Sequence, residues 1–175
     1  VPLAAASIAQ VHRGTLKTGE EVVFKIRRPD IEKVIETDTD ILMGLAYLVD
    51  KHLPGGEQYD SIGLVKEFRR SINRELDFSR EGRTIDRFTA NFSSDDSVRI
   101  PRVYWEFSGQ RVLTLEYLSG IKITRLDDLR SAGLDTKLLA RNGALLFLRQ
   151  VFEHGLFHAD PHPGNLHVLP QNVIC

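Results

Sequence analysis

The spacing of apolar side chains switches repeatedly between the periods of strands and helices, and this order constrains the fold more than any other feature. Residues 8–27 alternate as the two strands of a hairpin do. Apolar residues then recur at helical spacing over 31–53 and over 62–92. Strand patterns return over 98–118, and a further helix is predicted over 136–154. The chain is therefore predicted to be α+β, with a strand-rich first lobe that carries helical insertions, followed by the start of a helical lobe.

Breaks in the pattern place the ends of these elements. Pro54-Gly55-Gly56 is expected to stop the first helix, and Ser108-Gly109-Gln110 to turn one strand of the second hairpin into the next. The last helix is apolar on most faces, which predicts that it is buried. Ser119-Gly120 has the composition of a short linker, so we expect lobes at residues 1–118 and 119–175, with a cleft beside the linker.

Composition excludes several classes of protein. With 42% hydrophobic and 27% charged residues, the 175-residue chain can bury a core as one globular domain or a large piece of one. Its net charge of −1 gives no reason to expect nucleic acid as a partner. The single cysteine, Cys175, forbids an internal disulfide and fits a reducing compartment, and no apolar run is long enough to span a bilayer. Because the chain lacks an initiator methionine and stops within a strand pattern, we expect it to be a fragment.

The stretch F-H-A-D-P-H-P-G-N-L, residues 157–166, is too broken by proline for a helix and too polar for a core strand. Three interpretations of it stay open. In an extended segment His158, Asp160 and His162 point to one side, as a metal triad would. Alternatively, a phosphotransferase needs a carboxylate that orients the attacking group and, further along the loop, an amide oxygen that holds Mg²⁺, and Asp160 and Asn165 have that spacing. The third is that Asp160 and Asn165 bond only local backbone, as such residues do in turns.

A lysine lies in the middle of an apolar strand, at Lys25 in V-V-F-K-I. Burying an unpaired ammonium group is costly, so Lys25 either reaches the surface through its flexible stem or pairs with a carboxylate. The helical stretch after this strand offers Glu75, Asp77 and Glu81, of which Asp77 and Glu81 are expected to share a helix face. On their own these carboxylates are equally typical of a solvated face with arginines as counter-charges. Taken together with Lys25, Glu81 is the predicted partner of an ion pair that holds a nucleotide phosphate.

A run of alanines precedes the lysine strand, in P-L-A-A-A-S-I-A-Q-V-H, where a nucleotide kinase carries its glycine-rich loop. Four motifs in this order resemble those of the UbiB/AarF family of atypical protein-kinase-like proteins: the alanine run, V-V-F-K-I-R-R-P-D-I, E-L-D-F-S-R-E and the loop at 157–166. The resemblance covers nearly the whole chain. It implies a two-lobed protein-kinase-like fold that is truncated before the strand that carries the D-F-G motif.

The resemblance also implies a role for each matching residue. Lys25 would bind the phosphates and Glu81 would pair with it, with Asp160 as the catalytic aspartate and Asn165 as the metal-binding asparagine. Ala4, Ala5, Ala6 and Ser7 match the nucleotide loop, and Glu116, Tyr117 and Leu118 match the adenine-binding hinge. Glu75 and Asp77 match the family's E-x-D motif, which contacts an N-terminal extension. The implied cofactors are ATP or ADP with Mg²⁺.

The implied function is an ATP-binding atypical kinase or ATPase that acts in or regulates the biosynthesis of ubiquinone or another isoprenoid quinone. Its implied partners are nucleotide, quinone-biosynthesis enzymes and lipid precursors at a membrane surface, on the cytoplasmic or organellar matrix side, with any anchoring segment outside this chain. The family's K-x-G-Q signature and D-F-G aspartate are not in the sequence, so this stretch alone is expected to be inactive. Two alternatives stay open: a small-molecule phosphotransferase of the aminoglycoside or choline kinase type, and a nucleotide-binding pseudo-kinase scaffold.

Overall fold

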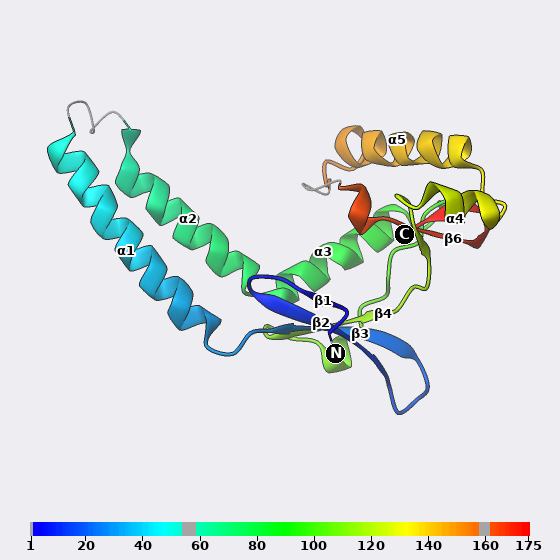
Figure 1. Ribbon diagram of the computed structural model, residues 1–175, viewed down its shortest axis with the longest axis horizontal. Coiled ribbons are helices and arrows are strands. Elements are labelled where there is room, and N and C mark those ends of the chain that lie inside the picture. Colours follow the sequence, from blue (N-terminus) through cyan, green and yellow to red (C-terminus); the bar gives the residue numbers. More distant parts are fainter. Residues whose placement is uncertain (1, 54–58, 158–161) are drawn as a thin grey trace. The chain divides into compact units, whose positions relative to one another are not determined.

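The computed structural model of the protein describes residues 2–53, 59–157 and 162–175 (Figure 1). The chain forms two compact units, of which the first consists of Val1–Gly82 and Tyr104–Thr114 and the second of Arg83–Val103 and Leu115–Cys175. Each unit is therefore assembled from two separate stretches of sequence. The predicted α+β class is confirmed, and the predicted lobe boundary after residue 118 stays a prediction.

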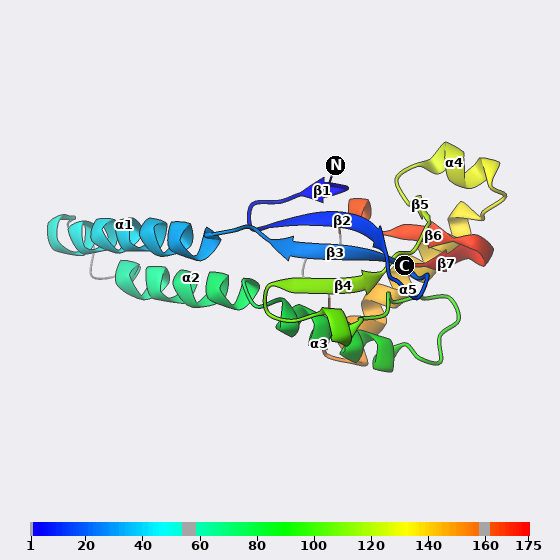
Figure 2. The same cartoon turned by 90° about the horizontal axis from the view of Figure 1, so that it is seen from below.

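The first unit is built on a four-stranded sheet in the order β1-β2-β3-β4 (Figure 2). Its strands are β1 (Ala4–Ala5), β2 (Ala9–Thr15), β3 (Glu21–Arg27) and β4 (Val112–Glu116). The predicted hairpin is confirmed: β2 and β3 pair antiparallel, and Gly19 in their turn takes a φ of 104°, which glycine adopts without strain. Val11 of β2 lies opposite both Ala4 of β1 and Lys25 of β3. The sheet thus aligns the alanine-rich segment with the lysine across neighbouring strands.

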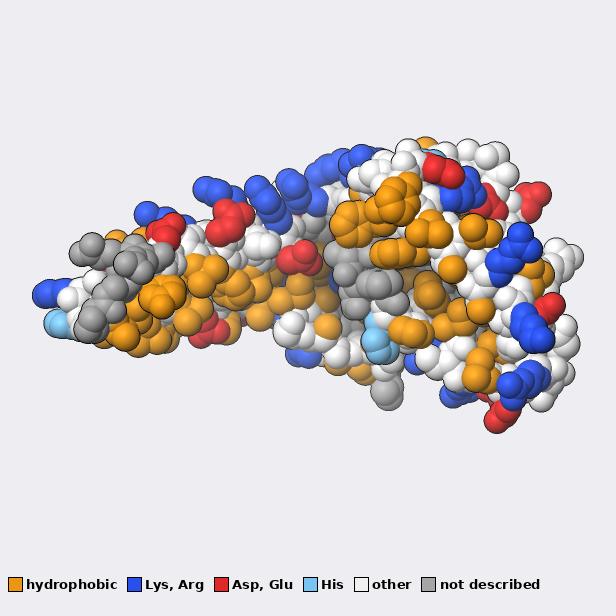
Figure 3. Space-filling model, turned by 90° about the horizontal axis from the view of Figure 1, so that it is seen from above, with side chains coloured by type: hydrophobic (Ala, Val, Ile, Leu, Met, Phe, Trp, Pro, Cys, Tyr) orange, Lys and Arg blue, Asp and Glu red, His pale blue; other side chains and the backbone are white. Residues whose placement is uncertain are grey.

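Two helices, α1 (Ile31–His52) and α2 (Ser61–Glu75), pack side by side in the first unit (Figure 1). Their contact face is small and partly polar: Thr39 and Ala46 of α1 are buried, and Arg69 of α2 donates to Thr39 Oγ1 at 3.1 Å. The outer face of α1 is apolar and exposed, and it carries Val34, Ile41, Leu45 and Leu48. Figure 3 shows apolar side chains on the surface of the part of the molecule that α1 and α2 form. The predicted helix over 31–53 is confirmed, and its predicted stop at residues 54–56 lies outside the described residues.

The prediction of one helical stretch over 62–92 was wrong at its centre, where α2 ends and α3 (Phe78–Asn91) begins. Asp77 lies at this break, and its Oδ1 accepts the Ser79 backbone N–H at 3.1 Å and the Ser79 hydroxyl at 2.5 Å. A carboxylate that satisfies a free N–H in this way favours a new helix start over continuation of the old helix. Asp77 and Glu81 therefore do not belong to one uninterrupted helix that begins at residue 62.

The core of the first unit lies where α3 meets β4. Phe78 and Leu113 are fully buried, and Gly82 is the point of closest approach. A Cβ at Gly82 would lie 2.8 Å from Cη2 of Trp105 and 3.2 Å from Cδ1 of Leu113, so no larger residue fits without movement. This packing seats the first turn of α3, which carries Glu81, against the sheet.

The second unit combines a small sheet with two helices. The sheet has the order β5-β6-β7, with β5 (Ile121–Lys122), β6 (His167–Leu169) and β7 (Val173–Ile174), and the helices are α4 (Leu126–Ser131) and α5 (Thr136–Phe152). Three short 3₁₀ turns complete the described elements: Trp105–Phe107 in the first unit, and Pro163–Asn165 and Pro170–Asn172 in the second. Leu129, Leu139, Val168 and Ile174 form the buried core between them. No helix within the described residues is both long and apolar enough to cross a membrane.

The predicted strand over 98–107 was wrong. Only single-residue bridges form there, from Val98 to Ile174 and from Val103 to Leu115, and Trp105–Phe107 is a 3₁₀ turn. Pro101 lies between the two bridges and has no N–H to donate to a ladder, which explains why the pairing does not extend. The strand expected over 111–118 is confirmed in its central part as β4.

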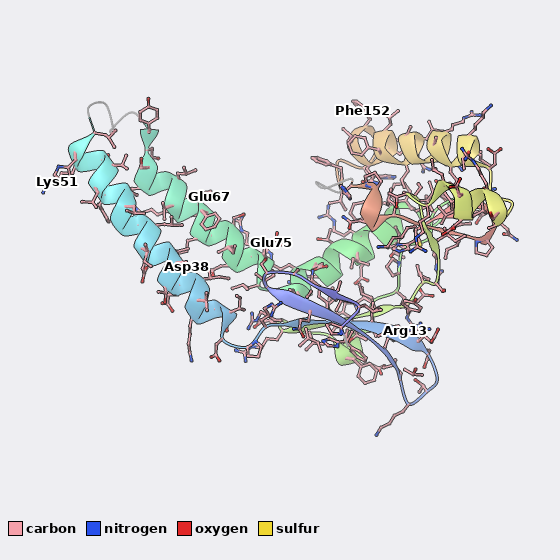
Figure 4. All side chains as sticks on the ribbon, viewed as in Figure 1. Arg13, Asp38, Lys51, Glu67, Glu75 and Phe152 are labelled. Atoms are coloured by element: carbon pink, nitrogen blue, oxygen red, sulfur yellow. The ribbon has the colours of Figure 1, made fainter. Side chains whose placement is uncertain are left out.

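Helix α5 confirms the helix predicted over 136–154, but the prediction that it is buried was wrong. Of its residues only Leu139 and Gln150 are buried. Leu145 is 46% exposed, Leu148 47% and Phe152 80%, and Figure 4 shows Phe152 at the end of the helix. An apolar composition on most faces therefore does not mean that every face is covered within this span.

Asp95, in the segment after α3, is tied to α5 by Arg149. The carboxylate of Asp95 accepts the Ser97 backbone N–H at 3.0 Å and its hydroxyl at 2.6 Å, and it forms an ion pair with Arg149. The Arg149 guanidinium also lies 5.3 Å from the ring centroid of Phe92. The pKa of Asp95 is held below its usual value by the Ser97 hydroxyl bond first, and then by the Ser97 backbone bond and the positive charge of Arg149.

This geometry predicts an acid-sensitive contribution to stability. Because the folded-state pKa of Asp95 is lowered, its contribution is complete above its unfolded-state pKa, about 4, and is lost as pH falls through the folded-state pKa. Asp95→Asn is expected to lower the free energy of unfolding near pH 7 by on the order of 1 kcal/mol, because solvent screens this partly exposed pair. Urea midpoints measured from pH 7 down to pH 3 would show the two curves converging at low pH. Asp96→Asn, at the exposed neighbouring position, is the matched control and should leave the urea midpoint at pH 7 unchanged. Curves for the wild-type protein and Asp95→Asn that stay parallel down to pH 3 would contradict the assignment.

Candidate functional site

Lys25 and Glu81 form the ion pair that the sequence predicts. The Lys25 ammonium donates to Glu81 Oε1 at 2.9 Å and to Oε2 at 2.7 Å, so it holds both oxygens of the carboxylate. The side chains are 31% and 40% exposed, which leaves the pair open to solvent on one side. A partly exposed ion pair adds little to the free energy of unfolding. It does hold the Lys25 ammonium group in one place while leaving it accessible to a ligand.

Phe78 forms an apolar support beneath the lysine. The Lys25 ammonium lies 4.9 Å from the centroid of the Phe78 ring, within the range of a cation–π interaction. The Phe78 ring is itself fully buried, and its backbone N–H donates to the Gln110 carbonyl at 3.1 Å. No functional role for Phe78 was predicted. Its spacing of one helical turn before Glu81 is the signal that could have indicated it.

The alanine-rich segment is a short strand followed by a tight turn. Ala4 and Ala5 pair with β2, and the Ala6 N–H donates to the Ala9 carbonyl at 2.9 Å. Residues 4–7 are all exposed, and none has a positive φ. The loop therefore keeps a backbone shape that alanine tolerates, in contrast to loops that depend on glycine. Its role in binding nucleotide stays a prediction.

Arg28, which was not predicted as a site residue, binds two carbonyl groups of the alanine-rich loop. The Arg28 Nε donates to the Ala6 carbonyl at 3.0 Å, and the Arg28 backbone N–H donates to the Ile8 carbonyl at 2.9 Å. The signal for this contact was available in R-R-P-D, because two basic residues that end the lysine strand lie near the loop that precedes it.

Glu75 and Asp77, the predicted E-x-D pair, have different environments. Asp77 begins α3 through its bonds to Ser79, which is the capping role of a helix start. Glu75 is exposed at the end of α2, where Figure 4 labels it. Helix capping explains the bonds that the Asp77 side chain makes within this chain. The predicted contact of Glu75 and Asp77 with an N-terminal extension stays a prediction.

The predicted hinge begins at the end of β4. The Glu116 carboxylate is held by Arg99 at 2.8 and 2.9 Å, and its backbone N–H donates to the Arg102 carbonyl at 2.9 Å. A hinge binds adenine through backbone groups, and the Glu116 N–H is already bonded to the Arg102 carbonyl, so the role of Glu116 in binding adenine stays a prediction. Tyr117 and Leu118 come next as half-buried residues, and their role also stays a prediction.

The described part of the predicted catalytic loop begins at His162, because His158 and Asp160 lie outside the described residues. His162 shapes the turn that comes after it: its Nδ1 accepts the Gly164 N–H at 3.0 Å and its carbonyl accepts the Asn165 N–H at 3.0 Å. Asn165 ends this 3₁₀ turn and is exposed. Its amide oxygen belongs to the class of ligand that Mg²⁺ prefers, so the residue fits the predicted metal-binding role.

The metal triad weighed for this loop stays untested, since two of its members are not described. Among the residues that are described, no group of three His, Cys, Asp or Glu side chains could hold a metal ion. His162 bonds the backbone in the manner of a turn residue, which accounts for it without a metal.

Comparison with known proteins assigns the chain to a family over its full length. The family model described as the ABC1 atypical kinase-like domain matches residues 1–175. A Synechocystis protein named "Uncharacterized protein sll1770" is 48% identical over 171 residues, which are 98% of this chain and 29% of that protein. A Cellvibrio japonicus protein named "Probable protein kinase UbiB" is 42% identical over 171 residues, which are 98% of this chain and 31% of that protein.

A solved structure shares the fold at moderate sequence identity. It is the complex of Rv3197 with erythromycin from Mycobacterium tuberculosis, with a TM-score of 0.80 at 26% identity, and the match covers 99% of this chain and 43% of that one. The chain thus spans about a third of the length of the curated relatives and less than half of the solved structure.

Proposed function

Since the chain belongs to the family of ABC1 atypical kinase-like domains, we propose that it is the nucleotide-binding part of an atypical kinase or ATPase of the UbiB type. The observation that carries the proposal is the ion pair between Lys25 and Glu81, with its ammonium group fixed and accessible. A fixed positive charge of this kind stabilises the phosphates of a bound nucleotide. The proposed ligands are ATP or ADP with Mg²⁺.

Each residue has a chemical task in this proposal. Lys25 neutralises phosphate charge, and Glu81 keeps the ammonium group from turning away. The exposed loop Ala4–Ser7 is proposed to meet the phosphates, with the Ser7 backbone N–H as the donor to a phosphate oxygen. Asp160 would orient the attacking hydroxyl or water, and the Asn165 amide oxygen would hold Mg²⁺, which would neutralise charge on the transferred phosphoryl group.

The wider role is also a proposal. We place the full protein in the biosynthesis of ubiquinone or another isoprenoid quinone, or in its regulation, because the four motifs resemble those of UbiB proteins and relatives carry that name. Its proposed partners are quinone-biosynthesis enzymes or lipid precursors at a membrane surface, on the cytoplasmic or organellar matrix side.

Phosphate release by the full-length protein tests the catalytic part of the proposal. Asp160→Asn is expected to lower ATP turnover at least about 100-fold, the usual contribution of a residue that orients and accepts a proton. ATP should still raise the melting temperature of the variant, because the phosphates and adenine are bound elsewhere. Asp127→Asn, on exposed helix α4, is the matched control and should retain wild-type turnover.

Two outcomes would redirect the proposal. A wild-type protein that is stabilised by ATP but releases no phosphate would be a nucleotide-binding scaffold. If the wild-type protein is neither stabilised by ATP nor releases phosphate, the proposal that it binds nucleotide is wrong.

A small-molecule phosphotransferase is the second candidate, and the ligand of the solved relative favours it. The Mycobacterium tuberculosis protein was solved in complex with erythromycin, a macrolide, and macrolides carry hydroxyl groups that can accept phosphate. Incubation of the full-length protein with ATP and a macrolide, followed by mass spectrometry, separates the candidates. A product heavier by one phosphate would support the phosphotransferase, whereas ATP turnover with an unmodified macrolide would favour the first proposal.

A further inference from the structure

We propose that Arg28 is a positioning residue that holds the alanine-rich loop in the shape needed to meet nucleotide phosphates, an inference that rests on the proposed function. Two bonds from this one residue reach the loop: the side-chain Nε to the Ala6 carbonyl at 3.0 Å and the backbone N–H to the Ile8 carbonyl at 2.9 Å. They hold the turn on both sides of Ser7. The Ala6 N–H closes the same turn on the Ala9 carbonyl at 2.9 Å.

The direction of these bonds decides where the Ser7 N–H points. In a planar trans peptide the carbonyl of one residue and the N–H of the next point in opposite directions, and the described chain has no cis peptide bonds. Since the Ala6 carbonyl points toward Arg28, the Ser7 N–H points away from it. Ser7 is exposed, so this donor is directed to the open side of the loop. A backbone N–H in that position can meet a phosphate oxygen.

An alanine loop needs such a support more than a glycine loop does. Glycines let a loop change its backbone angles to fit a triphosphate, whereas alanine at positions 4–6 restricts that adjustment. A loop that cannot adapt binds well only if it already has the right shape, because no ordering then has to occur on binding. Arg28 supplies this order through a charge-assisted bond to the Ala6 carbonyl, from the side of the loop opposite the Ser7 N–H.

Phosphate-specific weakening is the expected signature in the full-length protein. Arg28→Ala should bind ATP about tenfold more weakly, the usual effect of losing one hydrogen bond from a charged donor, and should bind adenosine with unchanged affinity. Titration of fluorescent ATP and of adenosine by competition measures both. Hydrogen exchange at residues 6–9 in nucleotide-free protein should become faster in the variant. Arg28→Lys keeps a charged donor and should recover part of the ATP affinity.

Arg111→Ala is the matched control for loss of charge. Arg111 lies near Arg28, is 75% exposed and contacts Glu32 at 3.6 Å, and its replacement should leave ATP affinity and exchange at 6–9 unchanged. Equal losses of ATP and adenosine affinity in Arg28→Ala would overturn the proposal, because they would show a general structural role. Unchanged ATP affinity would overturn it as well. If the wild-type protein binds no nucleotide, the proposed function fails, and the exchange measurement still decides whether Arg28 holds the loop.

Discussion

Replacing Lys25 with methionine is expected to lower ATP turnover by the full-length protein by between about 100-fold and about 1,000-fold, as the loss of one fixed charge at a reacting phosphate does in other enzymes. Methionine keeps the length and apolar contacts of the lysine stem but cannot replace the ammonium group that Glu81 holds at 2.7 Å. Turnover at saturating ATP and the affinity for ATP, measured separately, would show whether the charge acts in binding, in reaction or in both.

Glu81→Gln refines this prediction. The amide keeps an oxygen that can accept from Lys25 but loses the negative charge, so we expect a smaller loss of turnover than in Lys25→Met. Lys17→Met, at the exposed turn of the β2–β3 hairpin, is the control for removing a lysine and should behave like the wild-type protein. Wild-type turnover in Lys25→Met would show that the pair is structural and would remove the main support for the proposed function.

Phe78→Ala is expected to lower the free energy of unfolding by about 3–5 kcal/mol, the cost of deleting a fully buried aromatic side chain and leaving a cavity. Phe78 has no exposed surface and lies under Lys25 with its ring centroid 4.9 Å from the ammonium group. The variant is therefore expected to lose stability and to loosen the ion pair together. Urea denaturation followed by circular dichroism gives the free energy.

Phe78→Leu separates the two effects. Leucine fills most of the cavity, so its cost in stability should stay below about 1.5 kcal/mol, but it has no ring face for the ammonium group. A folded Phe78→Leu protein with reduced ATP turnover would show that the Phe78 ring helps to hold the Lys25 ammonium group. Phe107→Ala removes a phenylalanine that is 48% exposed in the same unit and should cost far less stability than Phe78→Ala; equal losses would contradict the assignment of Phe78 to the core.

Local signals predicted much of the fold. The hairpin of residues 8–27 combines alternation with a glycine turn, and the helices over 31–53 and 136–154 have long periodic patterns. The errors in the bounds of helices and strands occurred where a single residue interrupted a regular pattern of apolar side chains. Asp77 starts a new helix in the middle of an apolar repeat, and Pro101 prevents a ladder in a segment rich in β-formers.

The candidate site was predictable in its chemistry and only partly in its contacts. Lys25 and Glu81 could be paired because an apolar strand does not leave an ammonium group without a partner. The sequence signals at Arg28 and Phe78 mark these residues only as candidates, because their contacts depend on how the chain folds around β3. Such contacts join residues far apart in sequence, and no local pattern of hydrophobicity records them.

The pairings of Ile174 determine when the second unit can finish folding. Ile174 donates its N–H to the Ser97 carbonyl at 2.9 Å and accepts from the Arg99 N–H at 2.8 Å, in a parallel bridge with Val98. Contacts between such distant residues form slowly, because a large loop must close first. During synthesis the segment around Val98 leaves the ribosome well before its partner exists. We therefore expect this segment to stay unpaired until the residues around Ile174 have been synthesised, and an unpaired strand edge is prone to aggregation during that interval.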